Sequence, residues 1–155
     1  MATAPSRRIW RLFATSACVV LGLAQAQSTA CPTGVTAWNV SSPADALELI
    51  DALNCAGPAQ FEVDWSGKVS LTRTISISNG SSVTVTGLGA ADEAVIDGDG
   101  AVRLFEVTEG STLQLNTVSL VGGLSDEGGA IYSVSSNVII GGDTTFTNNA
   151  ASSGG

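Results

Sequence analysis

The segment ISNGSSVTV at residues 77–85 is matched position by position by VTEGSTLQL at residues 107–115. Each segment ends one apolar stretch, passes through a polar turn that contains glycine or serine, and begins a new apolar-polar-apolar run. A looser third copy, VSSNVII, occupies residues 134–140. A unit that recurs in this way predicts a repeat architecture and not a sandwich or a closed barrel.

The spacing between the copies indicates the kind of repeat. Val83 and Leu113 lie 30 residues apart, and Leu113 and Val138 lie 25 residues apart. Units of this length are typical of one coil of a right-handed parallel β-helix, the pectin lyase-like solenoid, in which each strand pairs with its equivalent in the next coil. We therefore predict an all-β fold with two inward columns of side chains. The columns are Val83, Leu113 and Val138, and Val85, Leu115 and Ile140.

Residues 42–55 follow a different period, which is helical. Ser42 is a good N-cap, Pro43 stands at the first helical position, and Asp45 lies in the first turn. Apolar residues recur at positions 46, 49, 50 and 53. We predict a short capping helix over 42–55 within an N-terminal cap region, residues 27–60, followed by β-helix coils over residues 61–155.

Residues 1–26 have the features of a secretory signal peptide. Three arginines precede an apolar stretch at residues 14–24, and the small residues of AQA at 24–26 offer a cleavage site. The apolar stretch is shorter than the roughly 20 residues that a membrane-spanning helix needs. The sequence therefore predicts a secreted, extracellular or cell-surface protein with no membrane span in the mature chain; a retained anchor is the alternative.

Charge and cysteine content narrow the classes of partner and cofactor. The formal net charge is −8, and removal of residues 1–26 leaves Lys68, Arg73 and Arg103 against fourteen acidic residues. Such a surface repels nucleic acid and anionic lipid. Cys31 and Cys55 are an even pair in an exported chain, so we expect one disulfide. Two thiols without histidine do not make a four-ligand metal site, and no cofactor is expected.

Two further sets of polar residues are candidate sites. Asn39 and Asn79 stand in glycosylation sequons, which matter only if the export pathway glycosylates proteins. Asp97 and Asp99 lie in a Gly- and Asp-rich stretch, residues 87–100, that we expect to protrude as a loop. These aspartates are candidate calcium ligands. A solvated turn is the favoured interpretation, because the later bidentate glutamate of a calcium loop is missing.

The sequence contains no histidine, which excludes Ser/His and Cys/His nucleophile pairs. The outward positions that can be placed, Ser76, Thr84, Gln114 and Ile139, contain no acid-base pair. We therefore expect a protein that is not an enzyme. The alternative is a fragment of a polysaccharide lyase or hydrolase-like β-helix enzyme, which would act on acidic polysaccharide through carboxylate-bound calcium or paired carboxylates.

One motif pair resembles a known family. GGAI at residues 128–131 and FTNN at residues 146–149 resemble the paired GGA(I/L/V) and FxxN repeats of the chlamydial polymorphic outer membrane proteins. The resemblance covers residues 128–155 well and residues 69–127 only in general character. The preceding unit departs from the motif, because it has Leu120 and Gly123 where Phe and Asn would stand.

Each motif residue also has an architectural interpretation. The two glycines permit a positive φ and close backbone approach, the alanine fits a tight turn, the two large apolar residues fill the interior, and the asparagine bonds neighbouring turn backbone. These residues are Gly128, Gly129, Ala130, Ile131, Phe146 and Asn149.

The family resemblance implies a surface module with an adhesin-like or structural role. We expect it to bind a cell-surface protein or polysaccharide without catalysis. A second Gly-Gly at residues 154–155 looks like the start of another coil, which predicts a truncated solenoid or one whose end is covered by a partner. End-to-end self-association through that C-terminal coil is one expected form of such covering.

Overall fold

The computed structural model describes residues 35–55 and 57–153, and within these ranges the chain forms fourteen β-strands and one α-helix, α1 (Pro43–Cys55). Every strand pairing is parallel. The described residues thus form mostly β-strands in parallel sheets, with one helix. This confirms the predicted all-β class.

The strands form four sheets. The five-stranded sheet contains β1 (Val35–Val40), β2 (Gln60–Trp65), β5 (Ser82–Gly87), β8 (Thr112–Asn116) and β12 (Asn137–Gly141). The four-stranded sheet contains β3 (Gly67–Ser70), β6 (Ala94–Asp97), β9 (Ser119–Val121) and β13 (Thr145–Thr147). The three-stranded sheet contains β4 (Ile75–Ile77), β7 (Phe105–Val107) and β11 (Ile131–Ser133). The two-stranded sheet pairs β10 (Leu124–Ser125) with β14 (Ala150–Ala151).

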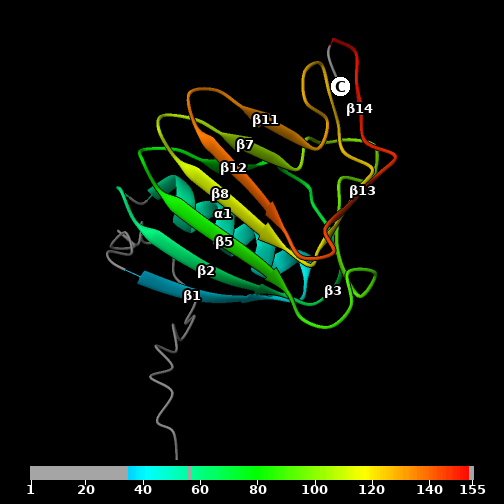
Figure 1. Ribbon diagram of the computed structural model, residues 1–155, viewed down its shortest axis with the longest axis horizontal. Helices are drawn as coiled ribbons and strands as arrows, with labels where there is room; N and C mark the ends of the chain where they lie inside the picture. Colours follow the sequence, from blue (N-terminus) through cyan, green and yellow to red (C-terminus); the bar gives the residue numbers. More distant parts are fainter. Residues whose placement is uncertain (1–34, 56, 154–155) are drawn as a thin grey trace, which may run out of the picture.

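The chain visits these sheets in a fixed order and then returns to the first. Figure 1 shows β1, β2, β5, β8 and β12 side by side, one from each pass. We call each pass a rung. Rung 1 spans residues 35–55, rung 2 spans 60–77, rung 3 spans 82–107, rung 4 spans 112–133 and rung 5 spans 137–153. Rung 1 contributes β1 and the helix, and each of rungs 2 to 5 adds one strand to each of three or four sheets.

The register between rungs is the one that the sequence repeats predict. Val83 pairs with Leu113, which pairs with Val138, and the same two strand pairings align Val85, Leu115 and Ile140. The side chains at positions 83, 85, 113 and 115 are buried, whereas their neighbours at 82, 84, 86, 112, 114 and 116 are partly exposed. Strand residues alternate between two faces, so this register places the apolar set of both strands in the core.

The helix begins and packs as its sequence predicts. The Ser42 hydroxyl accepts a hydrogen bond from the Asp45 backbone N–H at 3.3 Å, and the Asp45 carboxylate accepts one from the Ser41 N–H at 2.9 Å. These two bonds satisfy backbone donors at the start of the helix. The Ser41 backbone N–H, followed by the Ser42 hydroxyl, lowers the pKa of Asp45 below its ordinary value. The buried face comprises Ala46, Leu49, Ile50 and Leu53.

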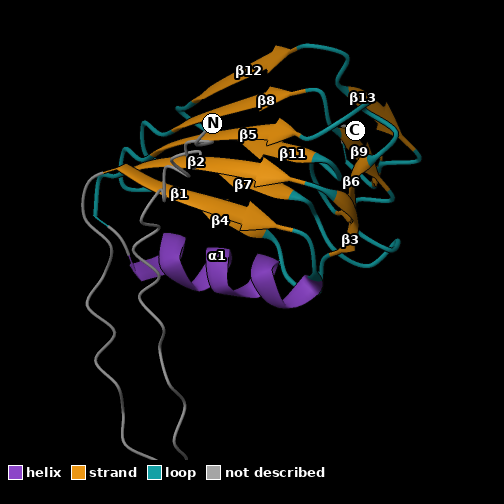
Figure 2. Cartoon of the chain, turned by 90° about the horizontal axis from the view of Figure 1, so that it is seen from below, coloured by secondary structure: helices purple, strands orange, loops and turns teal. Residues whose placement is uncertain are grey.

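Helix α1 lies across one end of the stack of rungs. It packs against β1, β3 and β4, which are the first strands of the three larger sheets. Figure 2 shows α1 at one end of the stack and β12 at the opposite end. The predicted position of the helix over the N-terminal end is therefore confirmed.

Two sequence-based boundaries differ from the structure. Strand β1 precedes the helix and pairs with β2, so the parallel sheet begins at residue 35, inside the predicted cap region. The stretch 87–100 is not a single protruding loop, because it contains β6, whose Ile96 is fully buried. Burial of Ile96 between Val69 and Leu120 in the four-stranded sheet outweighs the turn-forming tendency of the surrounding Gly and Asp residues.

In rung 5, two inward side chains are more exposed than the sequence predicts. Ile140 and Phe146 occupy inward positions of β12 and β13, but they are 45% and 48% exposed. Their counterparts in rung 4, Leu115 and Leu120, are fully buried. The prediction that Phe146 and Ile140 fill the interior is therefore wrong in this structure, because no described residue stacks on rung 5.

Several predictions concern residues outside the described ranges. These are the signal peptide at residues 1–26, Cys31 of the expected disulfide with Cys55, and the second Gly-Gly at residues 154–155. Within residues 35–55 and 57–153, the helix is neither long nor apolar enough to cross a membrane.

The column register makes a direct prediction about stability. Replacement of the fully buried Leu113 by Ala should lower the free energy of unfolding by about 2–5 kcal/mol, because a cavity forms between Val83 and Val138. The matched control is Gln114→Ala on the outward side of the same strand, which should change it by less than about 0.5 kcal/mol. Urea denaturation followed by circular dichroism measures both. Equal losses in the two variants would contradict the register.

Candidate binding surfaces

The residues of the family-like motif come together at the end of the stack. Strand β13 aligns Phe146 with Leu120, and β14 aligns Ala150 with Leu124, so FTNN lies directly beyond the equivalent positions of rung 4. A cavity of about 280 Å³ is formed there. Its lining comprises Gly128, Gly129, Ala130, Ile131, Phe146, Asn149 and Ala150. The structure thus brings all six predicted motif residues to one place.

Asn149 links rungs 4 and 5 through its side-chain amide. The oxygen accepts a hydrogen bond from the Gly123 N–H at 2.8 Å, and the amide nitrogen donates to the Leu120 carbonyl at 2.9 Å. Gly123 lies just beyond β9, where the strand ladder has ended, whereas Leu120 is a residue of β9 itself. The interpretation of Asn149 as a residue that bonds neighbouring turn backbone is confirmed.

The double glycine is required by local geometry. Gly128 has a φ of +54°, in the left-handed region that side-chain-bearing residues disfavour. A Cβ atom on Gly129 would lie 2.1 Å from the Ala150 carbonyl oxygen, which is too close for any substituted residue. The pair therefore allows rungs 4 and 5 to approach closely at this corner.

The exposed end of the stack is apolar at its inward positions. Ile140 and Phe146 are joined by the partly buried Val138 and Ile131, which pack against the core. We call the surface formed by Ile131, Val138, Ile140 and Phe146 the end face. It is the side of rung 5 opposite to α1 along the stack, as Figure 2 shows for β12.

A second surface is the outward face of the five-stranded sheet. Outward side chains on β5 and β8 carry hydroxyl and amide groups in aligned columns. On β12, Asn137 continues the column of Thr112, whereas Ile139 and Gly141 lie beside Gln114 and Asn116. We call this set the polar grid. It comprises Ser82, Thr84, Thr86, Thr112, Gln114, Asn116 and Asn137. Adjacent strands lie about 4.8 Å apart, so the grid presents hydrogen-bonding groups at a regular spacing.

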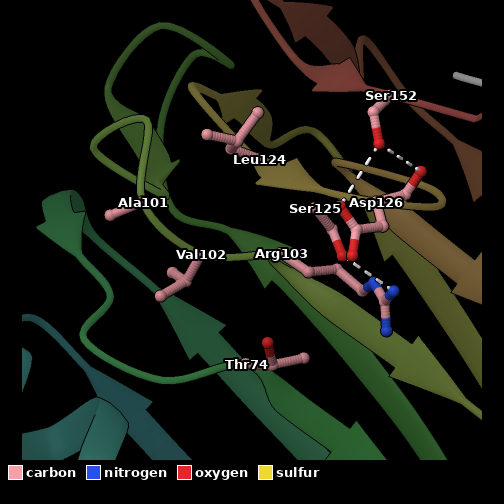
Figure 3. A pocket seen from close by; sticks show the side chains of 8 residues that line it. All are labelled: Thr74, Ala101, Val102, Arg103, Leu124, Ser125, Asp126 and Ser152. Carbon is pink, nitrogen blue, oxygen red and sulfur yellow. Dashed lines mark hydrogen bonds between the residues drawn. The ribbon is translucent and has the colours of Figure 1, made fainter.

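A third feature is a shallow pocket of about 520 Å³ beside β10. Figure 3 shows its lining side chains, with the Arg103 guanidinium directed toward Ser125 and with Ser152 close to Asp126. The lining comprises Thr74, Ala101, Val102, Arg103, Leu124, Ser125, Asp126 and Ser152. These residues come from rungs 2 to 5, so no local sequence pattern marked the pocket.

Arg103 is held by the protein around this pocket. Its guanidinium donates to the Glu127 carbonyl at 2.8 Å and to the Ser125 hydroxyl at 2.9 Å. It also forms an ion pair with Glu106 at 3.3 Å and lies 4.6 Å from the centre of the Tyr132 ring. Most of its donors are therefore occupied by rung 4, and Arg103 acts chiefly as a connection between rungs 3 and 4.

Asp97 and Asp99, the candidate calcium ligands, lie at the end of β6. One Asp97 oxygen accepts a hydrogen bond from the Asp99 N–H at 2.8 Å, and the other forms an ion pair with Lys68 at 2.7 Å. Burial raises the pKa of Asp97, but the Lys68 ammonium and the Asp99 N–H together outweigh it, so the pKa is lowered. The Asp97 hydrogen bond raises the pKa of Lys68. Asp97 is a buried residue of β6, so the interpretation as a solvated turn is wrong for Asp97, whereas Asp99 lies exposed in the turn that follows.

Among residues 35–55 and 57–153, no group of three or more Cys, Asp or Glu side chains is placed to hold a metal ion. Both sequon asparagines are accessible: Asn39 lies on β1 and Asn79 lies in the turn before β5, with a φ of +59°. Cys55 is the last residue of α1, and its pairing with Cys31 stays a prediction because Cys31 lies outside the described residues.

Comparison of the chain with protein-family models found no match, and no curated protein or solved structure matches it either.

The lowered pKa of Asp97 predicts a specific loss of stability in acid. A carboxyl whose folded-state pKa is below its unfolded value stabilises the fold above an unfolded-state pKa of about 3.9, and the contribution is lost as the pH falls through the folded-state pKa. Asp97→Asn should lower the free energy of unfolding at pH 7 by roughly 1 kcal/mol, a modest loss because Lys68 is largely exposed.

The stabilising contribution of Asp97 is tested by the pH dependence of urea unfolding between pH 6 and pH 2.5. The wild-type chain should lose more stability over this range than Asp97→Asn. Asp143→Asn, at an exposed aspartate in another turn, serves as the control and should follow the wild type. An identical pH dependence for wild type and Asp97→Asn would show that the ion pair with Lys68 does not stabilise the fold.

Proposed function

We propose that the stacked rungs are coils of a right-handed parallel β-helix of the pectin lyase-like kind. The support is the parallel register of each strand with its equivalent one rung away, over five strands in one sheet and four in another. The motif residues support the same proposal, because Asn149 and Gly129 make the corner contacts that a repeat of GGA(I/L/V) and FxxN would use in every coil. Membership of the chlamydial type of repeat is part of this proposal.

We further propose that the protein is a secreted or cell-surface module that binds a protein or glycan partner without catalysis. The observation that carries the proposal is the polar grid, in which hydroxyl and amide groups occupy matched outward positions of β5 and β8 and Asn137 continues one column on β12. Such groups hydrogen-bond to sugar hydroxyls and to polypeptide backbone. The signal-like residues 1–26 favour a location where such partners are found.

The enzymatic alternative is less favoured by the placement of the charged groups. Glu106 is paired with Arg103, and the two oxygens of Asp97 are engaged by Lys68 and by the Asp99 backbone. A lyase or hydrolase needs carboxylates that are directed toward a substrate, with a basic residue or a second carboxylate opposite. The outward columns of β5 and β8 are composed of Ser, Thr, Gln and Asn. The exposed carboxylates of Glu62 and Asp64 lie on the adjacent β2, where no Lys or Arg occupies a paired position.

Binding through the polar grid is tested with immobilised probes. The purified chain is passed over cellulose, chitin, mannan and gelatin, which present neutral sugar hydroxyls or extended backbone. We expect measurable binding to at least one probe and a loss of at least fivefold in the double variant Thr84→Lys and Gln114→Lys, because bulky charges would hold the probe away from the sheet. Thr147→Lys, at an exposed threonine of the four-stranded sheet, is the control and should bind as the wild type does.

If none of the probes binds, or if Thr147→Lys loses as much binding as the double variant, the polar grid is not the binding surface. Circular dichroism of each variant separates loss of binding from loss of fold.

An activity assay distinguishes the proposed binding module from the enzymatic alternative. The chain is incubated with pectin and with alginate in the presence of Ca²⁺, and absorbance is followed for unsaturated uronate products, with reducing ends measured in parallel. We expect no product above a heat-denatured control, because the carboxylates beside Arg103 and Lys68 are held in internal ion pairs. Product formation that disappears in Asp97→Asn or Arg103→Lys would establish the enzymatic alternative instead.

A further inference from the structure

We propose that the pocket beside β10 binds a neutral pyranose ring. Its volume of about 520 Å³ lies within the range of roughly 300–1,000 Å³ that small-molecule sites occupy. Three observations carry the inference: an exposed apolar wall, hydroxyl and carboxylate groups with unused hydrogen-bonding capacity, and the pairing of every nearby cation. The pocket shares no residue with the polar grid, so the proposal does not depend on binding through the grid.

The pocket lies on the side of the stack, at the corner between the four-stranded and three-stranded sheets. The residues that carry the inference belong to rungs 3 and 4, each of which has a described rung on both sides. The Leu124 N–H donates to the Val102 carbonyl at 3.0 Å, which joins the two rungs at the pocket wall. Among the described lining residues, Ser152 alone comes from rung 5.

One side of the pocket is apolar and the other is polar, as Figure 3 shows. The apolar side comprises Ala101, Val102 and Leu124, and the polar side comprises Ser125, Asp126 and Ser152. The Leu124 side chain is 44% exposed, whereas Leu115 and Leu120 of the same rung are fully buried. A ligand with an apolar face can cover this leucine and remove apolar surface from water. The C–H groups of a pyranose ring form such a face.

The polar side has donors and acceptors that the described residues do not use. The Ser125 oxygen accepts a hydrogen bond from Arg103 at 2.9 Å, but its own O–H donates to no described group. The Ser152 hydroxyl donates to one carboxylate oxygen of Asp126 at 3.2 Å, and the other oxygen accepts nothing from the described residues. A hydroxyl donor beside a carboxylate acceptor matches neighbouring sugar hydroxyls, because each of those both donates and accepts.

The charges around the pocket disfavour an acidic ligand. Every Lys and Arg in residues 35–55 and 57–153 is engaged in an ion pair. The pairs are Lys68 with Asp97, Arg73 with Asp51, and Arg103 with Glu106. The exposed carboxylates of Asp126 and Glu127 form no ion pair with a described residue. The pocket therefore has an excess of negative charge, which repels a uronate or a phosphorylated sugar.

An amino sugar is less well matched than a neutral one. Asp126 is exposed, and an ion pair between an amine and an exposed carboxylate contributes little. An ammonium group has no lone pair, so it cannot accept a hydrogen bond from the Ser125 hydroxyl. A neutral sugar can satisfy both groups with its own hydroxyls.

The test titrates the full chain, labelled with ¹⁵N, with methyl glycosides and follows amide signals by NMR. The neutral probes are the methyl glycosides of glucose, galactose and mannose. The charged counterparts are the methyl glycosides of galacturonic acid and glucosamine. We expect at least one neutral probe to shift the amide signals of Leu124, Ser125 and Asp126, with a Kd on the order of 1 mM. The charged counterparts should bind at least fivefold more weakly.

Matched variants locate the sugar within the pocket. Leu124→Ser should weaken binding of the neutral probe at least fivefold, whereas Leu88→Ser, at a leucine of almost equal exposure elsewhere, should change it by less than twofold. The two side chains are 44% and 45% exposed. Asp126→Ala should also weaken binding at least fivefold, with Asp143→Ala as its control at another exposed aspartate. The NMR spectrum of each variant shows whether it keeps the fold.

The double variant Thr84→Lys and Gln114→Lys separates this site from the polar grid. It should bind the methyl glycosides as the wild type does, because neither residue lines the pocket. Failure of binding through the grid would therefore leave sugar binding in the pocket intact, and the reverse also holds.

Three results would overturn the proposal. The first is that none of the neutral probes shifts the amide signals of the pocket residues. The second is that the galacturonic acid or glucosamine glycoside binds as tightly as the best neutral probe or more tightly. The third is equal weakening by Leu124→Ser and Leu88→Ser, or by Asp126→Ala and Asp143→Ala, in variants that keep the wild-type spectrum.

Discussion

The rest of the structure depends on one constraint, the stacking of each buried side chain on its equivalent in the next rung. Parallel pairing brings Val83, Leu113 and Val138 into line, and it does so for every inward position of the same strands. A slip of one residue would turn a whole strand's apolar set outward. The columns therefore hold the register, and the register in turn places the corners, turns and outward side chains.

Stacking of this kind stabilises a rung only when both of its faces are covered. Helix α1 covers the first strands of the three larger sheets, and rungs 2 to 4 cover one another. Rung 5 is covered on one side among the described residues, and the exposure of Ile140 and Phe146 follows directly.

At the corners between sheets, backbone N–H and C=O groups cannot pair in strand ladders and need other hydrogen-bond partners. Asn149 satisfies two backbone groups of rung 4, and the small size of Gly129 permits the close approach of Ala150. Arg103 connects the turn at Glu127 with rung 3. These corner contacts do not use the outward side chains of β5 and β8. The proposed polar grid consists of such outward side chains.

The sequence by itself determined the all-β class, the helix with its cap and buried face, and the pairing of β5, β8 and β12, because these depend on local periods and on the repeat spacing. It also identified the motif residues that meet at one corner. Only the tertiary structure decided that β1 joins the sheet and that β6 lies within residues 87–100, since neighbouring strands stabilise both short segments. The tertiary structure also decided the surroundings of Arg103, because they involve residues from several rungs. It likewise decided the exposure of Phe146, because that depends on which residues pack over rung 5.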